Sequence, residues 1–229
     1  MVSIKAQNIQ FPSDSQTTPG YLAQPDNGKP HPGIVLIQEW WGLVPHIKDV
    51  AERFAREGYV ALAPDLYHGK EAKEPDEARK LAMQLDHARA VDEIKAAAAY
   101  LNSTSDVSPK KVGVVGWCMG GGLALSTAAR FGDLGAVVTF YGRPLDESDT
   151  AKLLVPVLGL YGEQDQSIRP EAVRDFGEEL EKHHIPHEIH IYAGAGHAFF
   201  NDTRPEAYRP DAALDAWTRT LDWFSKYLR

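Results

Sequence analysis

The chain alternates short apolar runs with amphipathic segments, and this alternation limits the possible folds more than any other feature of its 229 residues. Short continuous apolar runs are typical of strands buried on both faces of a parallel sheet, whereas apolar residues spaced three and four apart indicate helices. Strands are expected at 33–38, 59–63, 111–115, 136–140, 155–161 and 188–192, and helices at 45–55, 75–101 with a break near Asp86, 119–129, 169–182 and 211–227. Strand and helix in regular succession predict an α/β fold, a doubly wound and mostly parallel sheet with helices on both faces.

The N-terminal part of the chain has a different pattern. Residues 3–11 and 20–23 have the composition of two short strands, and the polar segment 13–18 between them is typical of a turn. We expect these strands to pair antiparallel at an edge of the sheet. Because no linker-like run or internal repeat interrupts the chain, residues 1–229 are expected to form a single domain.

Charge and hydropathy limit the possible partners. The formal net charge of −8 arises from acidic and basic residues mixed along the chain, so no basic face for nucleic acid or anionic lipid is indicated. The first residues contain no apolar signal-peptide core, and no run approaches the roughly 18 apolar residues of a membrane span. The sequence therefore predicts a cytoplasmic protein that binds neither nucleic acid nor membrane.

The only cysteine of the chain lies in a glycine-rich motif. The segment GWCMG at 116–120 directly follows a predicted strand and opens a predicted helix. A Gly-x-Cys-x-Gly motif in this context matches a nucleophile elbow, in which a strained turn presents the nucleophile above the sheet, at the start of a helix that favours a thiolate. The alternatives for Cys118 are an inert buried cysteine or a redox-sensitive thiol.

Two polar residues after later strands favour the catalytic interpretation. Asp165 follows the strand at 155–161, and His197 follows the last strand. Nucleophile, acid and histidine occur in the chain order of the α/β-hydrolase triad, and parallel strands bring their following loops to the same sheet edge. We expect His197 to exchange a proton with Cys118 and Asp165 to orient the imidazole, with Glu163 and Asp202 as rival acids.

The first central strand leads into a loop of unusual composition. Glu39, Trp40 and Trp41 follow this strand, where the fold places the second part of its oxyanion hole. The backbone amides of Trp40 and Met119 are therefore the candidate oxyanion donors, each worth roughly 3 kcal/mol. A carboxyl group in such a site requires a partner, so Glu39 is expected to accept the thiol proton or a hydrogen bond from an arginine, unless it is a solvated loop residue.

Other side chains at the same edge are candidates for contact with substrate: Trp41, Tyr141, Arg143 and Phe199. A structural role is an equal alternative for the aromatic residues and for Arg143. The histidines do not indicate a metal site, because Pro186 interrupts helical spacing and strand alternation puts His187 and His190 on opposite faces.

Several motifs together resemble the dienelactone hydrolase family: IQEWWG at 37–42, APDLY at 63–67, GWCMGG at 116–121, FYG at 140–142, Asp165, and Gly196 with His197. The resemblance spans almost the whole chain. It implies an α/β-hydrolase without a lid domain, usually monomeric and without a cofactor, that opens enol lactones such as carboxymethylenebutenolide in the breakdown of aromatic compounds. It also implies that Cys118, Asp165 and His197 form the triad and that Glu39 influences the resting state of the thiol.

The sequence departs from the family pattern after the catalytic histidine. The family carries an arginine there that holds the substrate carboxylate, whereas residues 198–201 are Ala-Phe-Phe-Asn. Arg79, Arg143 and Arg204 are the arginines that remain as substitutes. The alternatives to a lactone hydrolase are a general carboxylesterase or thioesterase with the same triad, and a non-catalytic redox-thiol protein on the same scaffold.

Overall fold

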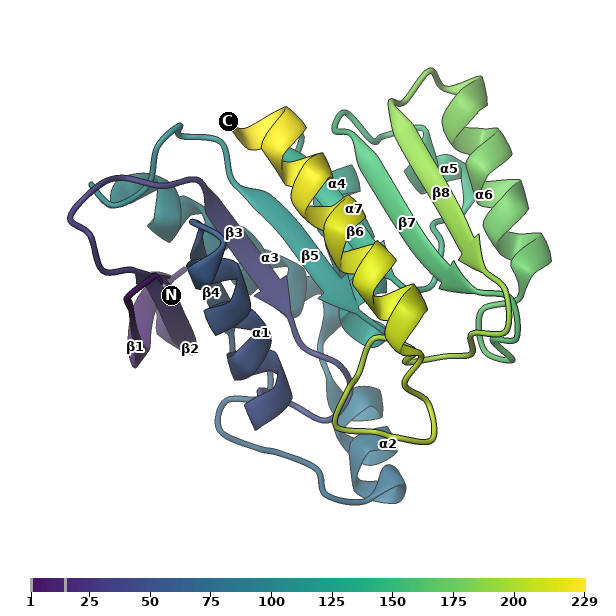
Figure 1. Cartoon of the computed structure of the whole chain (residues 1–229), viewed down its shortest axis with the longest axis horizontal. Helices are drawn as coiled ribbons and strands as arrows, with labels where there is room; N and C mark the ends of the chain where they lie inside the picture. The colour runs from purple at the N-terminus through teal and green to yellow at the C-terminus, as the bar shows by residue number, and fades with distance from the viewer. Residues whose placement is uncertain (1, 15) are drawn as a thin grey trace.

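A computed structural model describes residues 2–14 and 16–229 of the chain (Figure 1). The strands are β1 (Ile4–Ser13), β2 (Gln16–Pro25), β3 (Gly33–Ile37), β4 (Val60–Pro64), β5 (Gly113–Trp117), β6 (Ala136–Phe140), β7 (Val157–Gly162) and β8 (His187–Tyr192). The helices are α1 (Pro45–Arg56), α2 (Pro75–Gln84), α3 (His87–Ser103), α4 (Met119–Arg130), α5 (Glu147–Thr150), α6 (Pro170–Lys182) and α7 (Pro210–Leu228).

The strands form one sheet in the order β1-β2-β4-β3-β5-β6-β7-β8. From β4 to β8 every neighbouring pair is parallel, and β1 and β2 add an antiparallel hairpin at one edge. The predicted mostly parallel α/β fold is therefore confirmed, as is the antiparallel pair at the sheet edge. The hairpin strands are longer than predicted, so most of the expected turn at 13–18 is strand, and residue 15 of that turn lies outside the described residues.

Successive side chains of the central strands pack into two separate hydrophobic cores, one on each face of the sheet. Ile34 and Leu36 of β3 pack on the side covered by α1 and α7, whereas Val35 and Ile37 pack on the side covered by α3, α4 and α6. Figure 1 shows α7 lying across the front of the sheet. Because both faces are covered, the central strands are apolar throughout, which explains their continuous hydrophobic runs.

Local sequence accounts for where several helices begin and end. Asp86 caps α3, because its side chain accepts hydrogen bonds from the amides of Ala88 and Arg89, and the predicted break near this residue is confirmed. Gly58 takes a φ of 87° just after α1, a conformation that suits glycine at a helix end. None of the helices in the described part of the chain combines the length and apolar character needed to cross a bilayer.

Candidate active site

Cys118 lies in a strained turn between β5 and α4. Its φ of 55° and ψ of −119° are unusual for a residue with a side chain, and its amide donates a hydrogen bond to the carbonyl of Phe140 at 3.0 Å. The thiol is half-buried at the first turn of α4. The strand before it is predicted at 111–115 but runs from Gly113 to Trp117, so Cys118 directly follows the last strand residue.

The glycines on either side of Cys118 permit this turn. A Cβ on Gly116 would lie 2.1 Å from the carbonyl oxygen of Gly120, and a Cβ on Gly120 would lie 2.4 Å from the carbonyl oxygens of Ile37 and Gln38. These atoms belong to the backbone, so the shift that would relieve the contact is costly. The tight approach of α4 to β3 and β5 therefore requires glycine at both positions.

His197 and Asp165 are brought together from separate loops. Nδ1 of His197 lies 2.7 Å from Oδ2 of Asp165, whose side chain is fully buried. The other carboxylate oxygen of Asp165 accepts hydrogen bonds from the amides of Ser167 and Ile168 at 2.7 and 2.9 Å. Both oxygens are thus occupied, which holds the carboxylate in one orientation toward the imidazole.

The protonation of His197 follows from these neighbours. Burial alone would lower the pKa of His197, but the hydrogen bond that His197 donates to Asp165, together with the sulfur of Cys118, raises it to about 10. Burial would likewise raise the pKa of Asp165, yet His197 and the two amides bring it below its usual value. At neutral pH the pair is therefore an imidazolium and a carboxylate, and the positive charge stands beside the Cys118 sulfur.

Glu39 is buried under the site with 2% of its surface exposed. Tyr141 donates its hydroxyl proton to Oε1 of Glu39 at 3.3 Å, and Asn201 donates from Nδ2 to Oε2 at 2.8 Å. An arginine was one expected partner for this carboxyl group, but in residues 2–14 and 16–229 Glu39 forms no ion pair within 4.0 Å. Its two partners are neutral donors, and neither was identified from the sequence.

His46 of α1 also lies near Glu39. It is 4% exposed, and burial lowers its pKa despite the opposing effects of Glu39 and Asp202. His46 is thus neutral at pH 7. In the sequence it is one polar residue beside the apolar positions of a helix, and no pattern distinguishes it from a solvent-facing residue.

The two candidate oxyanion donors are backbone amides of Trp40 and Met119. Met119 is the first residue of α4, so its amide has no partner within the helix. In the described part of the chain, neither amide donates a hydrogen bond to a backbone carbonyl in a turn, loop or helix cap. Tyr67 borders the same turn, because its hydroxyl donates to the sulfur of Met119 at 3.5 Å.

The expected substrate-contacting residues fall into two groups. Trp41 is half-buried, with its ring 5.2 Å from that of Trp40 and the guanidinium of Arg204 5.5 Å away, and Arg143 is exposed after β6. Phe199 is fully buried and packs 5.4 Å from Tyr141, which is itself fully buried. Both rings pack in the core beneath the site, and the ring of Tyr141 also lies 5.0 Å from that of His197, so contact of these two residues with substrate stays a prediction.

The alternative residues lie in other surroundings. Glu163 accepts a hydrogen bond from the amide of Gly194, and Asp202 pairs with Arg53 of α1, so the imidazole of His197 is left to Asp165. Arg79 is exposed beside Asp76 on α2. In the described ranges no three His, Cys, Asp or Glu side chains cluster closely enough to hold a metal.

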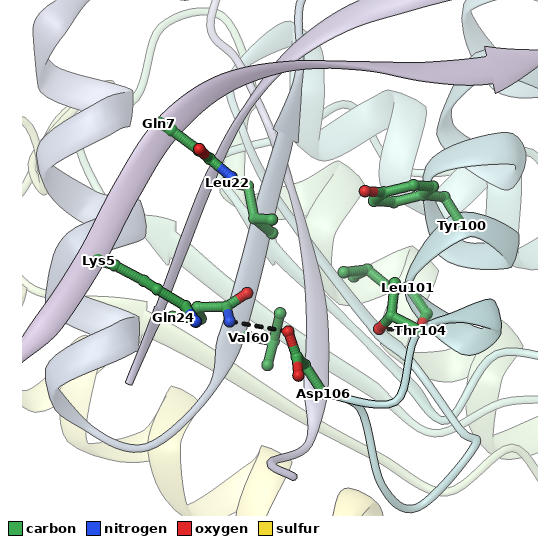
Figure 2. Close-up of a pocket in the computed structure, with 9 residues that line it drawn as sticks. All are labelled: Lys5, Gln7, Leu22, Gln24, Val60, Tyr100, Leu101, Thr104 and Asp106. Carbon is green, nitrogen blue, oxygen red and sulfur yellow. Dashed lines mark hydrogen bonds between the residues drawn. The ribbon is translucent and has the colours of Figure 1, made fainter. Parts of the chain in front are cut away.

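Two cavities lie away from the contact between His197 and Asp165. One of about 380 Å³ lies between the loop after β4 and the helices α2 and α3, and it shares Tyr67 with the region around Cys118. The other, of about 190 Å³, is shown in Figure 2 and lies at the amino ends of the parallel strands, opposite Cys118. Gln24 and Asp106, joined by a hydrogen bond of 2.9 Å, form part of its wall.

Comparisons with known proteins agree with this geometry. The sequence profile of the Dienelactone hydrolase family matches residues 18–228. Protein usf of Aquifex pyrophilus is 39% identical over 230 residues, and the match covers 97% of this chain and 99% of that protein. An Aquifex aeolicus protein provisionally named a carboxymethylenebutenolidase is 33% identical, and the match again covers 97% of this chain and 99% of that protein. A crystal structure from Klebsiella pneumoniae, provisionally named a dienelactone hydrolase, has a TM-score of 0.90 at 30% identity and covers 98% of this chain and 100% of its own.

Proposed function

Because the chain belongs to the dienelactone hydrolase family and is therefore a hydrolase, we propose that it cleaves carboxylic esters or lactones through a covalent thioester on Cys118. The observation that carries this proposal is the 2.7 Å contact between His197 and Asp165 at the sheet edge where Cys118 opens α4. A redox thiol requires neither of these two residues. A nucleophile requires both a proton carrier and a residue that orients it.

Acylation is the first step of the proposed reaction. The Cys118 thiolate attacks the carbonyl carbon, a carbon–sulfur bond forms, and the carbonyl electron pair moves onto oxygen. The amides of Trp40 and Met119 donate hydrogen bonds to this oxyanion. When the oxyanion collapses, the carbon–oxygen bond of the leaving group breaks, and the imidazolium of His197 protonates the departing alkoxide.

Deacylation then reverses the role of His197. The thioester sulfur carries no charge, so acylation removes the part of the His197 pKa elevation that comes from Cys118. Neutral His197 takes a proton from water, and the hydroxide attacks the thioester carbonyl. Collapse of the second tetrahedral intermediate breaks the carbon–sulfur bond and releases the carboxylic acid, and the thiolate leaves beside a protonated His197. No cofactor takes part in the proposed cycle.

The substrate is the finer part of the proposal. The name of the Aquifex aeolicus relative supports an enol lactone of the carboxymethylenebutenolide type, which would give the enzyme a place in the breakdown of aromatic compounds. A general carboxylesterase or thioesterase is favoured instead by residues 198–201, Ala-Phe-Phe-Asn, which include no arginine to hold a substrate carboxylate. Both candidates use the same chemistry and differ in whether the substrate carries a carboxylate.

The test is hydrolysis of short-chain aryl esters and of a dienelactone by the wild-type protein and Cys118→Ala. We expect turnover by the wild type, and a loss of roughly 10⁴- to 10⁶-fold in kcat/KM for the variant. Turnover of both substrates supports the lactone hydrolase, and turnover of aryl esters alone supports the carboxylesterase. Equal activity in Cys118→Ala would refute the nucleophile, and no turnover of either ester by fully reduced protein would refute the hydrolytic mechanism.

A further inference from the structure

We propose that Asn201 is a positioning residue that holds the carboxyl group of Glu39 at the site and, through Glu39, sets the reactivity of the Cys118 thiol. This inference rests on the proposed function in one respect, that Cys118 is the nucleophile, and it starts from the expected influence of Glu39 on the Cys118 thiol. Asn201 lies in the loop between β8 and α7 and is 2% exposed. Its Nδ2 donates to Oε2 of Glu39 at 2.8 Å, across 162 positions of sequence.

The orientation of the Asn201 amide is determined by its other bonds. Its Oδ1 accepts from the backbone amide of Thr203 at 3.1 Å and from the Thr203 hydroxyl at 2.6 Å. Because oxygen is the end that accepts, the NH₂ end must point at Glu39. The Asn201 backbone is also tied into the loop, since its amide donates to Ala198 and its carbonyl accepts from Arg204.

Few interactions other than the hydrogen bond from Asn201 hold the carboxyl group of Glu39 in position. The hydrogen bond from Tyr141 is longer, at 3.3 Å, and the part of the chain that the structure describes offers no cation within 4.0 Å. Each oxygen of Glu39 accepts one hydrogen bond from a neutral donor. Removal of Asn201 would leave one buried oxygen unpaired, and the side chain would gain by turning away from its present position.

The same contacts connect Glu39 with the reacting groups. Glu39 immediately precedes Trp40 on the proposed oxyanion loop, and the ring of Tyr141 lies 5.0 Å from that of His197. Asn201 contacts Glu39 but not the imidazole–carboxylate pair, so it acts through another residue. A shift of Glu39 would change the electrostatic surroundings of Cys118 without altering the hydrogen bond between His197 and Asp165.

Any pH-dependent measurement at this site reports on several groups. Tyr141, after β6, and His46, of α1, face Glu39, and the pKa of Tyr141 is raised by burial, by Glu39 and by Cys118. Tyr67, after β4, and His197, after β8, face the thiol, and Asp202 and Arg204 act from the loop that holds Asn201. The test must therefore isolate the part of a pH profile that depends on Glu39.

The test is a double-mutant cycle of Asn201→Leu and Glu39→Gln in the full-length protein. The first measurement is the rate at which iodoacetamide alkylates the single thiol as a function of pH, and the second is kcat and KM for an aryl ester. We expect Asn201→Leu to displace the alkylation midpoint by about half a pH unit or more and to lower kcat roughly tenfold, with KM nearly unchanged. In the Glu39→Gln background the same substitution should change neither quantity.

Further variants guard against loss of folding. Asn201→Asp keeps the oxygen that Thr203 binds but replaces the donor with an acceptor, so it should reproduce the Asn201→Leu effects even where the leucine variant does not fold. Thr203→Val removes only the hydroxyl that orients Asn201 and should produce a smaller shift in the same direction. Glu163→Gln, a surface change nearby, should leave the profile as in the wild type.

The outcomes separate this proposal from the proposed function. Equal effects of Asn201→Leu with and without Glu39 would overturn the positioning role, while wild-type hydrolysis that depends on Cys118 would leave the function intact. Alkylation of Cys118 does not require ester hydrolysis. A shift of the alkylation midpoint that depends on Glu39 would therefore support the positioning role even in a protein that hydrolyses no ester. An unchanged alkylation profile in folded Asn201→Leu and Asn201→Asp would refute it.

Discussion

The carboxyl edge of the parallel strands and the β1–β2 hairpin differ in how the backbone is used. Six non-glycine residues in the described ranges have positive φ, and four of them follow parallel strands at the carboxyl edge: His68, Cys118, Tyr141 and Ala198. In the hairpin, by contrast, each residue of β1 pairs in register with one of β2, and the one such residue there, Asp14, is in the turn.

The difference indicates where this molecule tolerates strain. A residue held in a sparsely populated backbone conformation costs about 1–3 kcal/mol, so it persists only where surrounding structure enforces it. Around Cys118, the proposed nucleophile, the surrounding structure is the close approach of α4 to β3 and β5 at Gly116 and Gly120. Substitutions at this edge should affect chemistry more than stability, and substitutions at the hairpin should do the reverse.

Asp165→Asn should have the largest effect in this comparison. The amide side chain still fills the buried space but loses the charge that stabilises the imidazolium, so kcat/KM should fall roughly 10³- to 10⁴-fold. Steady-state hydrolysis of an aryl ester measures the loss, and thermal unfolding checks that the fold persists. Glu163→Gln and Asp202→Asn are matched controls for the rival acids. A larger loss in either control than in Asp165→Asn would reassign the acid.

Gly120→Ala should lower both activity and stability. Its new Cβ would meet the carbonyl oxygens of Ile37 and Gln38 at 2.4 Å, and the resulting shift of α4 should cost about 3 kcal/mol of unfolding free energy. Gly122→Ala is the matched control in the same helix, because its Cβ would lie 3.6 Å from the nearest atoms, those of Arg143. Chemical denaturation should show the control to be as stable as the wild type or more so. Equal losses of unfolding free energy in the two variants would show that the close approach of α4 to the sheet does not explain why glycine is required at position 120.

The pH dependence of stability should show the raised pKa of His197. A group whose pKa rises from 6.5 to about 10 on folding contributes stability that is complete below pH 6.5 and is lost as the pH rises toward 10. The difference in unfolding free energy between the wild type and His197→Gln should therefore shrink across this interval. Denaturation at a series of pH values measures it. A difference that grows with pH would contradict the imidazolium in the resting site.

Gln24→Leu in the hairpin should have the smallest effect. It removes the hydrogen bond to Asp106 at the opposite edge of the sheet and should cost about 0.5–1.5 kcal/mol of stability. Because this wall lies at the amino ends of the parallel strands, kcat and KM for an aryl ester should remain at wild-type values. A change in either constant would show that the two edges are coupled.

The fold could be predicted because strand and helix periodicities are local. The apolar runs and the capping residue Asp86 indicated the elements, and most boundaries differ by one or two residues. The strand before Cys118 was predicted to end at 115, just before the Gly-x-Cys-x-Gly motif begins. In the structure Gly116 lies inside β5 and approaches the backbone of Gly120 in α4, a contact between elements that the local pattern does not encode. The one-turn helix α5 has no apolar periodicity and was not predicted.

The candidate site was only partly predictable, because some of its contacts join distant loops. Cys118, Asp165 and His197 were identified from motif and order after strands, and the structure brings Asp165 and His197 into contact. The hydrogen bonds that Asn201 and Tyr141 donate to Glu39 depend on loop conformations that no local pattern encodes. Contact of Phe199 with substrate stays a prediction, because residues next to His197 can face either the site or the core and sequence spacing does not distinguish these directions.

The loop between β8 and α7 carries both His197 and Asn201, only four residues apart. One of these side chains reaches Asp165, after β7, and the other reaches Glu39, after β3, so a single short segment contacts loops on opposite sides of Cys118. In enzyme engineering this segment should be exchanged as a whole. A chimaera that takes His197 from one homologue and residue 201 from another would leave Glu39 without its matching hydrogen-bond donor, so junctions should lie outside 197–201.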